Sequence, residues 1–229
     1  LTMYQIDFNK PTHVHFIGIG GSNMSGLAEL LADRGFTVSG SDCTQNAACE
    51  RLSQRGIKVF YGQYAENIAP DTGLVVYTAA IREDNEELAR AKAAGIPLLN
   101  RAEFLGQLMR QYKDAISVAG THGKTTTSSM LSTIFLEAGL DPSISIGTVL
   151  TPSGSSARAG HSEHFIVESC EYTNSFLHFY PRHEIILNIE AEHLDFFKDI
   201  EDIRHSFRLF MEKLSSGGNL VIQGDIEKI

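Results

Sequence analysis

Short apolar runs alternate with helical patterns through the first half of this chain. The expected strands are His13–Ile17, Thr37–Ser39, Ile57–Tyr61, Leu74–Thr78 and Pro97–Leu99. The expected helices are Met24–Arg34, Thr44–Arg55, Asn85–Ala94 and Arg101–Gln111. Gly35, Gly56 and Gly95 each separate a helix from the next strand, where a left-handed residue commonly ends a helix. This alternation predicts an α/β fold built on a parallel sheet that helices cover on both faces.

The same kind of pattern restarts near residue 113. Strands are expected at Ala115–Ala119, Phe165–Glu168, Glu184–Ile189 and Asn219–Gln223, and helices at Lys124–Ala138 and Ile200–Leu214. The segment Thr151–Gly160 is rich in Ser, Gly and Pro and is expected to be a loop. We therefore expect two α/β domains in tandem, residues 1–112 and residues 113–229. Because the second pattern stops just after a strand, we expect that domain to be truncated.

Composition excludes several classes of function. The 229 residues have a formal net charge of −9 and contain no cluster of five basic residues, so binding to nucleic acid is not expected. No apolar run approaches the roughly 20 residues of a membrane span, and the N-terminus lacks a signal-peptide pattern. We expect a cytoplasmic protein that binds no membrane. The cysteines Cys43, Cys49 and Cys170 match no zinc motif and are expected to be reduced thiols with structural roles.

The strongest local motif lies between an expected strand and an expected helix, and reads Gly120-Thr121-His122-Gly123-Lys124-Thr125-Thr126. Backbone N–H groups of such a loop point at an anion, and the helix N-terminus adds positive potential. Lys124 would reach the outer phosphates of a nucleotide, and the hydroxyl of Thr125 would ligate Mg²⁺. Val118 replaces the first glycine of a complete Walker A motif, and the alternative is a plain Gly/Thr-rich turn. The flanking strand and helix favour a phosphate loop.

A second glycine-rich segment, Gly18-Ile19-Gly20-Gly21-Ser22-Asn23, joins the first strand to the first helix. Asp42 ends the second strand, roughly where a dinucleotide-binding domain places its ribose-binding acid. Asn23 replaces the third glycine of that fingerprint, so the motif is weak when taken alone. It predicts either a nucleotide site or a turn that only packs the helix against the sheet.

Acidic and histidine side chains follow two strands of the second domain. Glu168 ends one strand, Glu171 follows three residues later, and His193 comes after the strand Glu184–Ile189. In an open parallel sheet, ligands bind beyond the carboxyl ends of the strands. These side chains and the phosphate loop are therefore expected to converge on one Mg-nucleotide. For His193 taken alone, a structural role is the alternative.

Together these segments resemble the Mur ligase family, and within it the branch that joins L-alanine to UDP-N-acetylmuramate. The resemblance rests mainly on the strings His15–Glu29, Gly120–Thr127 and Asn188–Asp195. Shorter supporting strings are Ser39–Asp42, Tyr77–Ile81, Asn100–Glu103 and Ser175–His178. The likeness extends from about residue 12 to the end of the chain, and the order of the strings makes it highly specific.

The resemblance implies a Rossmann-like domain that binds UDP-N-acetylmuramate, followed by a P-loop ATPase-type α/β domain, here partial. It also implies a C-terminal domain that lies outside this chain. ATP and Mg²⁺ are the implied cofactors, and L-alanine is the implied second substrate, joined through an acyl phosphate. The residues implied to hold the UDP-sugar are Gly18, Gly20, Gly21, Ser22, Asp42 and Thr78. Those implied to hold ATP are Gly120, Thr121, His122, Gly123, Lys124, Thr125 and Thr126.

The resemblance further assigns chemistry to individual residues. Lys124 and His193 are the implied catalytic residues. The implied metal ligands are Thr125 and Glu168 for Mg²⁺, and His193 at a second metal site. The chain departs from the family pattern near this site. Cys170 and Thr173 stand where acids are common, Glu192 where aspartate is usual, and Ser156 where asparagine is usual. These departures place the surroundings of the metal site in question, but not Lys124, Glu168 or His193 themselves.

Three other functions remain open at this point. A sister ligase attaches a recycled peptide to the same UDP-sugar, and its distinguishing pocket would lie outside this chain. An NAD-dependent oxidoreductase would use the first glycine-rich loop but would leave the phosphate loop unexplained. A non-catalytic nucleotide-binding module is the third alternative. We expect the 229-residue chain to bind UDP-sugar without forming the amide by itself.

Overall fold

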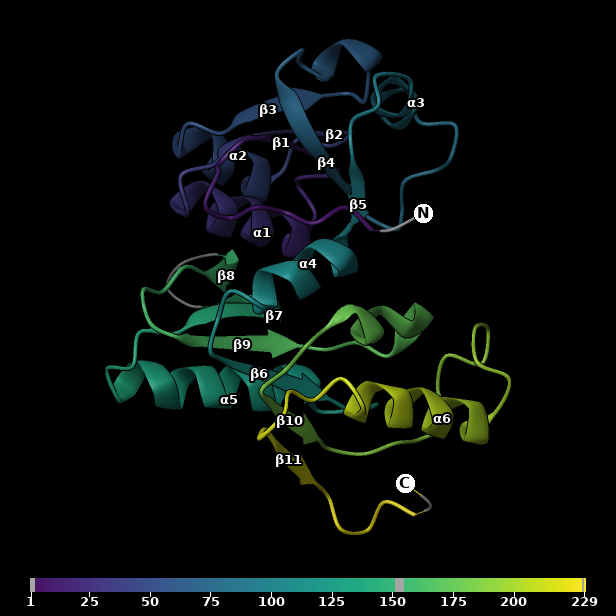
Figure 1. Cartoon of the computed structure of the whole chain (residues 1–229). Helices are drawn as coiled ribbons and strands as arrows, with labels where there is room; N and C mark the ends of the chain where they lie inside the picture. Colours follow the sequence, from purple (N-terminus) through teal and green to yellow (C-terminus); the bar gives the residue numbers. More distant parts are fainter. Residues whose placement is uncertain (1–2, 151–154, 228) are drawn as a thin grey trace. The chain divides into compact units, whose positions relative to one another are not determined.

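The computed structural model describes residues 3–150, 155–227 and 229 (Figure 1). Contacts between residues divide the chain into two compact units. The first comprises Leu1–Phe104 with Val149–Ala159, and the second comprises Leu105–Thr148 with Gly160–Ile229. The expected division into functional domains between residues 112 and 113 stays a prediction. In the described part of the chain, no helix is both long enough and apolar enough to cross a membrane.

The first unit is built on a five-stranded parallel sheet in the order β3-β2-β1-β4-β5. Its strands are β1 (His13–Ile17), β2 (Thr37–Asp42), β3 (Lys58–Tyr61), β4 (Thr72–Tyr77) and β5 (Leu98–Asn100). Its helices are α1 (Ser22–Asp33), α2 (Ala47–Gln54), the short 3-10 helix η1 (Ala65–Asn67) and α3 (Glu86–Ala93); α4 (Arg101–Met109) divides between the units. This topology confirms the expected Rossmann-like fold. The strand order reverses between β1 and β4, which is where such sheets bind ligands.

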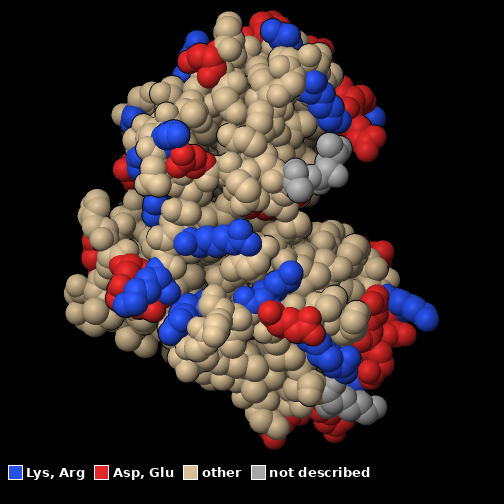
Figure 2. Space-filling model, viewed as in Figure 1, with Lys and Arg blue, Asp and Glu red and all other residues tan. Residues whose placement is uncertain are grey.

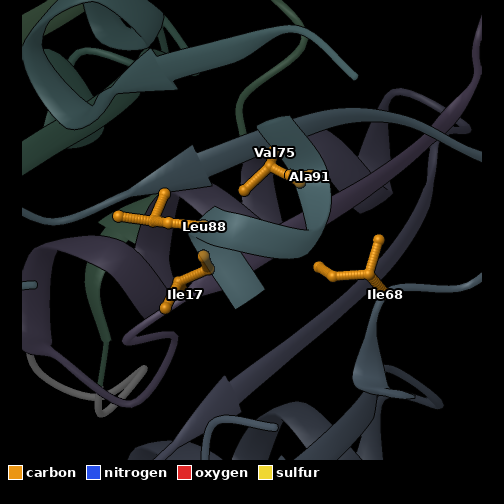
Figure 3. Close-up of a cluster of buried hydrophobic side chains, with 5 residues drawn as sticks. All are labelled: Ile17, Ile68, Val75, Leu88 and Ala91. Atoms are coloured by element: carbon orange, nitrogen blue, oxygen red, sulfur yellow. The ribbon is translucent and has the colours of Figure 1, made fainter. Parts of the chain in front are cut away.

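Alternating side chains of β1 supply both faces of this sheet. Ile17 packs with Val75 of β4 and with Leu88 and Ala91 of α3, and Ile68 completes this buried cluster (Figure 3). On the other face, the buried ring of Phe16 meets Phe104 edge to face, with ring centroids 5.7 Å apart. Full burial of each large apolar side chain contributes about 1.5–3 kcal/mol to folding. The glycine-rich loop therefore starts from a strand that is anchored on both sides.

The second unit carries most of a six-stranded sheet with the order β11-β10-β6-β9-β7-β8, of which β8 and the last residues of β7 belong to the first unit. The strands are β6 (Asp114–Ala119), β7 (Ser143–Leu150), β8 (Ser155–Arg158), β9 (His164–Glu168), β10 (His183–Ile186) and β11 (Asn219–Ile222). All of them except β8 are joined by parallel pairing. The helices are α5 (Lys124–Glu137), the 3-10 segment η2 (Tyr172–His178) and α6 (Ile200–Met211). Phe176 of η2 stacks on Phe210 of α6 at 4.4 Å and meets Phe207 edge to face at 5.2 Å.

The expected loop over Thr151–Gly160 is partly wrong, because Ser155–Arg158 forms strand β8. Residues 151–154 of that expectation lie outside the described residues. Strand β7 was also not expected. The alternating isoleucines of β7 are a strand signal that the expectation overlooked. Strand β8 reads Ser-Ser-Ala-Arg, in which three small residues carry little strand preference. Small size is what packing requires here, since a Cβ atom added at Gly26 of α1 would lie 2.4 Å from the Cβ of Ala157.

Charged side chains of both signs are interspersed on the surface. Figure 2 shows Lys and Arg side chains among Asp and Glu side chains on the face that it draws. This mixed pattern accompanies the modest net charge of −9.

Candidate substrate and nucleotide sites

The first unit has an open pocket of about 500 Å³ at the point where its strand order reverses. The turns after β1 and β4 form much of its wall, together with the end of β2 and the start of α3. The lining residues are Gly18, Gly21, Asp42, Cys43, Gln63, Thr78, Ala80, Ile81, Arg82, Asp84 and Asn85. The pocket therefore joins segments that are more than 60 residues apart in the sequence.

Two glycines of the loop are required by close contacts. Gly18 has φ of +82°, and a Cβ atom there would lie 2.7 Å from the side chain of Thr78. A Cβ atom at Gly20 would lie 2.7 Å from the sulfur of Cys49 and 2.9 Å from an oxygen of Asp42. The backbone thus comes close enough to these side chains that only glycine fits.

Asp42 fixes the loop from the neighbouring strand. Its Oδ2 accepts a hydrogen bond from the backbone N–H of Gly20 at 2.9 Å, and its Oδ1 accepts one from Thr44 at 3.0 Å. Gly21 is the N-cap of α1, with no side chain bonded to the helix end and no acidic residue in the first turn. The N-terminus of α1 therefore keeps the positive potential that favours a phosphate group.

The phosphate loop of the second unit connects β6 to α5. Gly123 is the N-cap of α5 in the left-handed conformation, with φ of +82° and no side-chain cap. Gly120, with φ of +137°, passes the backbone of Asn188 so closely that an added Cβ would lie 3.2 Å from it. Asn188 holds the loop from the strand side, since its Oδ1 accepts from the N–H of His122 at 2.8 Å and its Nδ2 donates to the His122 carbonyl.

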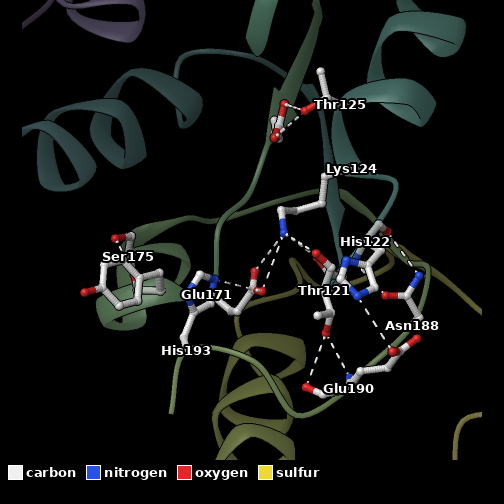
Figure 4. Close-up of polar contacts among 12 residues, drawn as sticks. Thr121, His122, Lys124, Thr125, Glu171, Ser175, Asn188, Glu190 and His193 are labelled. Carbon is white, nitrogen blue, oxygen red and sulfur yellow. Dashed lines mark hydrogen bonds and ion pairs between the residues drawn. The ribbon is translucent and has the colours of Figure 1, made fainter. Parts of the chain in front are cut away.

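Lys124 lies on the inner side of this loop (Figure 4). Its ammonium donates to the carbonyl oxygens of Gly120 and Thr121. It also forms an ion pair of 3.1 Å with Glu171, a carboxylate only 2% exposed. This ion pair and the two backbone contacts hold the ammonium of Lys124 beside the N-terminus of α5.

Thr125 and Glu168 form a second polar pair at the loop. The Thr125 hydroxyl donates to the carboxylate of Glu168 at 2.9 Å, and the N–H of Gly147 donates to the same carboxylate at 2.6 Å. Carboxylate and hydroxyl oxygens are the ligands that Mg²⁺ prefers. The two side chains therefore fit the implied metal, and a nucleotide on the loop would supply further oxygens.

His193 belongs to a third group, next to Glu171. Its Nε2 lies 3.8 Å from Glu171 Oε1, and ligand atoms of Glu171, Glu192 and His193 all lie within 4.8 Å of one another. The ring of Tyr172 packs against the imidazole at a tilt of 35°, with centroids 4.6 Å apart, and its hydroxyl donates a hydrogen bond to Asp195 at 2.8 Å. That hydrogen bond raises the pKa of Tyr172 above its usual value. His193 has φ of +56°, a strained conformation of the kind that clusters at functional sites.

Two family models match the chain along almost its whole length. The description "Mur ligase family, catalytic domain" matches residues 13–113, and "Mur ligase middle domain" matches residues 118–229. The chain belongs to the Mur ligase family. This Mur ligase chain is 62% identical over 226 residues to the UDP-N-acetylmuramate–L-alanine ligase of Lachnoclostridium phytofermentans, covering 99% of the chain and 48% of that relative. It is 61% identical to the ligase of the same name from Agathobacter rectalis. That match covers 99% of this chain and 49% of the relative.

Solved structures give the same family. The UDP-N-acetylmuramate:L-alanyl-gamma-D-glutamyl-meso-diaminopimelate ligase of Neisseria meningitides superposes with a TM-score of 0.86 at 30% identity, over 95% of this chain and 73% of that one. A UDP-N-acetylmuramate–alanine ligase of Thermotoga maritima superposes with a TM-score of 0.83 at 27% identity. The superposition covers 94% of this chain and 50% of that one. The chain spans about half the length of the curated relatives that it matches.

The structure brings many of the expected site residues together. Of the residues expected to hold the UDP-sugar, Gly18, Gly21, Asp42 and Thr78 line the pocket. Gly20 contacts Asp42, whereas Ser22 begins α1 and does not line the pocket. In the phosphate loop, Lys124 and Thr125 point at acidic partners, while Thr126 is exposed. The roles of all these residues stay predictions.

Glu168 and His193 lie in different groups of possible ligand atoms, and their roles at a first and a second metal site stay predictions. Glu168 pairs with Thr125, and His193 groups with Glu171 and Glu192. Glu171 was left out of the expected ligand set, although its place three residues after Glu168 was the signal that could have found it. Its separation of 47 residues from Lys124 hid the pairing.

The Ser156 hydroxyl donates a hydrogen bond to the Ser22 carbonyl beside the glycine-rich loop. The expected effect of Ser156 on the metal site stays a prediction. Cys43 is exposed and lines the pocket, so the expected structural role does not describe it. Cys49 is buried against Gly20, and burial raises the pKa of its thiol. Cys43 and Cys49 are free thiols, as expected.

Proposed function

We propose that this chain binds UDP-N-acetylmuramate in the pocket of the first unit and Mg-ATP at the phosphate loop of the second. The complete enzyme would use both sites to join L-alanine to the UDP-sugar. The observation that carries the proposal is the arrangement of Lys124 and Thr125 at an uncapped helix N-terminus, each with its own buried or half-buried carboxylate. The names of the relatives at 62% and 61% identity support the choice of substrates.

The proposed reaction has two steps. The carboxylate of the UDP-sugar attacks the γ-phosphate of ATP, which forms an acyl phosphate and releases ADP. The amine of L-alanine then attacks the acyl carbon, and phosphate leaves to give the amide. The first step brings two anions together, so the site must offset their repulsion. Lys124 would contribute by binding the transferred phosphoryl group, and Mg²⁺ held by Thr125 and Glu168 would supply further positive charge.

In this proposal Glu171 and His193 act beside Lys124. Glu171 orients Lys124 through the 3.1 Å ion pair, and the ring of Tyr172 packs against the imidazole of His193 and keeps it in place. His193, Glu171 and Glu192 would together offer nitrogen and oxygen atoms to a second cation. Catalysis in the cytoplasm, where UDP-sugars and ATP are made, completes the proposal.

The first test compares ligands on the 229-residue chain by calorimetric titration. UDP-N-acetylmuramate and Mg-ATP should each bind with one equivalent, and NAD should not. Lys124→Ala should weaken Mg-ATP and leave the UDP-sugar unaffected, which separates the two sites. Binding of NAD with no response to the UDP-sugar would favour the oxidoreductase alternative.

The second test addresses the amino-acid substrate. A chimera can be made in which residues 1–229 are followed by the second half of the Lachnoclostridium relative. Phosphate release by the chimera should depend on L-alanine and not on the tripeptide used by the sister ligase. The chain alone should release little phosphate, because aligning three reactants can be worth about 7–11 kcal/mol of barrier and part of that alignment would come from the second half. Equal turnover by the chain alone would contradict this division of labour.

A further inference from the structure

We propose that the second unit has a separate binding site for a transition-metal cation, of which Zn²⁺ is the best fit. Its ligands are Asp114, Glu163 and His164, with His183 as a fourth. Asp114 begins β6, His164 begins β9 directly beside it in register, and His183 begins β10 on the other side of β6. The phosphate loop follows the opposite end of β6. The two sites therefore lie at opposite ends of β6.

The first supporting observation is the spacing of the side chains. Ligand atoms of Asp114, Glu163 and His164 all lie within 4.8 Å of one another. Asp114 Oδ2 is 3.6 Å from His164 Nδ1, and Asp114 Oδ1 is 3.7 Å from His183 Nε2. Both distances are too long for hydrogen bonds. Tetrahedral zinc with bonds of about 2.0–2.1 Å holds neighbouring ligand atoms roughly 3.3 Å apart, so a small inward movement would complete the site.

The second observation is an unsatisfied nitrogen. Within the described part of the chain, Nδ1 of His164 is inaccessible to solvent and has no hydrogen-bond partner. A buried polar atom in that state is unfavourable unless something else binds it. The ring of Phe135 meets His164 edge to face, with centroids 5.3 Å apart, and helps to fix the imidazole orientation. A neutral imidazole in this position would direct the Nδ1 lone pair toward Asp114.

His183 has an amide partner on β11. Its Nδ1 lies 3.0 Å from the Nδ2 of Asn219. A half-turn of the amide would place its oxygen there instead, so that Nδ1 donates the hydrogen bond and the lone pair of Nε2 faces Asp114. Partners of this kind fix the tautomer of metal-binding histidines. Two imidazoles with carboxylates form a ligand set that suits zinc better than Mg²⁺.

Lys113 competes with the proposed cation for the carboxylate of Glu163. Its ammonium lies 3.1 Å from Glu163, and both side chains are largely exposed. An exposed ion pair is weak and does not hold Glu163 in one place. The carboxylate can therefore turn from Lys113 toward a cation. A bound cation would connect β9, β6 and β10 at their amino ends and would stabilise the second unit independently of nucleotide.

The test uses the 229-residue chain after treatment with a chelator. Zn²⁺ is titrated by calorimetry, and Co²⁺ replaces it for visible absorption, which reports tetrahedral coordination. One equivalent should bind to the parent chain and should persist in His193→Ala, which alters the group near the phosphate loop. His164→Ala and Asp114→Asn should each weaken that equivalent at least tenfold, and His183→Ala should weaken it less. His161→Ala, at an exposed neighbouring histidine, is the matched control and should change nothing.

Two further measurements make the outcome decisive. Zn²⁺ should raise the melting temperature of the parent chain and of His193→Ala, but not that of Asp114→Asn, whose fold is checked by circular dichroism. Lys113→Gln should tighten Zn²⁺ binding by freeing Glu163. The proposal is overturned if zinc does not bind, or if its affinity is unchanged in both His164→Ala and Asp114→Asn. Loss of the cobalt spectrum in His193→Ala alone would assign the cation to the phosphate-loop group instead.

Discussion

Replacing Glu184 with glutamine removes a carboxyl group that is fully buried on β10. Neither of its oxygens has a hydrogen-bond partner within the described residues. Burial raises the pKa of this carboxyl group from 4.5 to about 8. The folded chain therefore keeps Glu184 protonated at neutral pH, whereas the unfolded chain ionises it.

The stability consequence follows from this difference in bound protons. Because the folded-state pKa is raised, the contribution of Glu184 is fully present below pH 4.5 and is lost as the pH rises toward about 8. Between those values the folded state binds about one proton more than the unfolded state. The free energy of unfolding should then fall by about 1.4 kcal/mol for each pH unit because of this one group. Glu184→Gln cannot ionise, so it should remove that slope.

Urea unfolding at pH 6, 7 and 8, followed by far-ultraviolet circular dichroism, measures the effect. The transitions of the two units are fitted separately, since only the second unit contains Glu184. The stability of Glu184→Gln relative to the parent should rise by about 2–3 kcal/mol from pH 6 to pH 8. Glu137→Gln, at an exposed glutamate of α5, is the control and should follow the parent. Parallel pH dependence of Glu184→Gln and the parent would refute the reasoning, whatever the absolute difference between them.

Three further predictions concern the candidate sites. Lys124→Ala in the chimera should lower turnover about 10²–10³-fold, measured as phosphate release, because it removes one charged contact to the reacting phosphoryl group, while calorimetry shows UDP-sugar binding intact. Gly18→Ala should weaken UDP-sugar binding in the same titration, since its Cβ would lie 2.7 Å from Thr78 and its φ is +82°. Gly35→Ala is the control, because Gly35 also has a positive φ, of +84°, but an added Cβ there would meet no atom within 4 Å. Gly147→Ala should raise the Mg²⁺ concentration needed for half-maximal turnover, because its Cβ would lie 2.8 Å from Glu168; an unchanged requirement would separate Glu168 from the metal.

The sequence predicted what depends on neighbouring residues. The strand, loop and helix around Lys124 were found because glycine, lysine and threonine occur within a few positions of one another. The sheet of the first unit followed from regular alternation and from glycines such as Gly56 and Gly95, both of which have positive φ. Strand β8 was missed because its short side chains carry little strand preference, and its formation depends on packing against Gly26.

Long-range pairing explains the rest of what the sequence missed. Glu171 is one acid among several after β9, and only the folded chain shows that it faces both Lys124 and His193. Asp114 and His164 are likewise unremarkable in sequence, at positions 50 residues apart, until parallel register places them side by side. The same geometry decides what each edge of the sheet offers. The carboxyl ends of the strands lead into loops and the positive end of α5, which suit phosphate. The amino ends present imidazole and carboxylate groups with no helix N-terminus of their own, so a cation is the complementary ligand there.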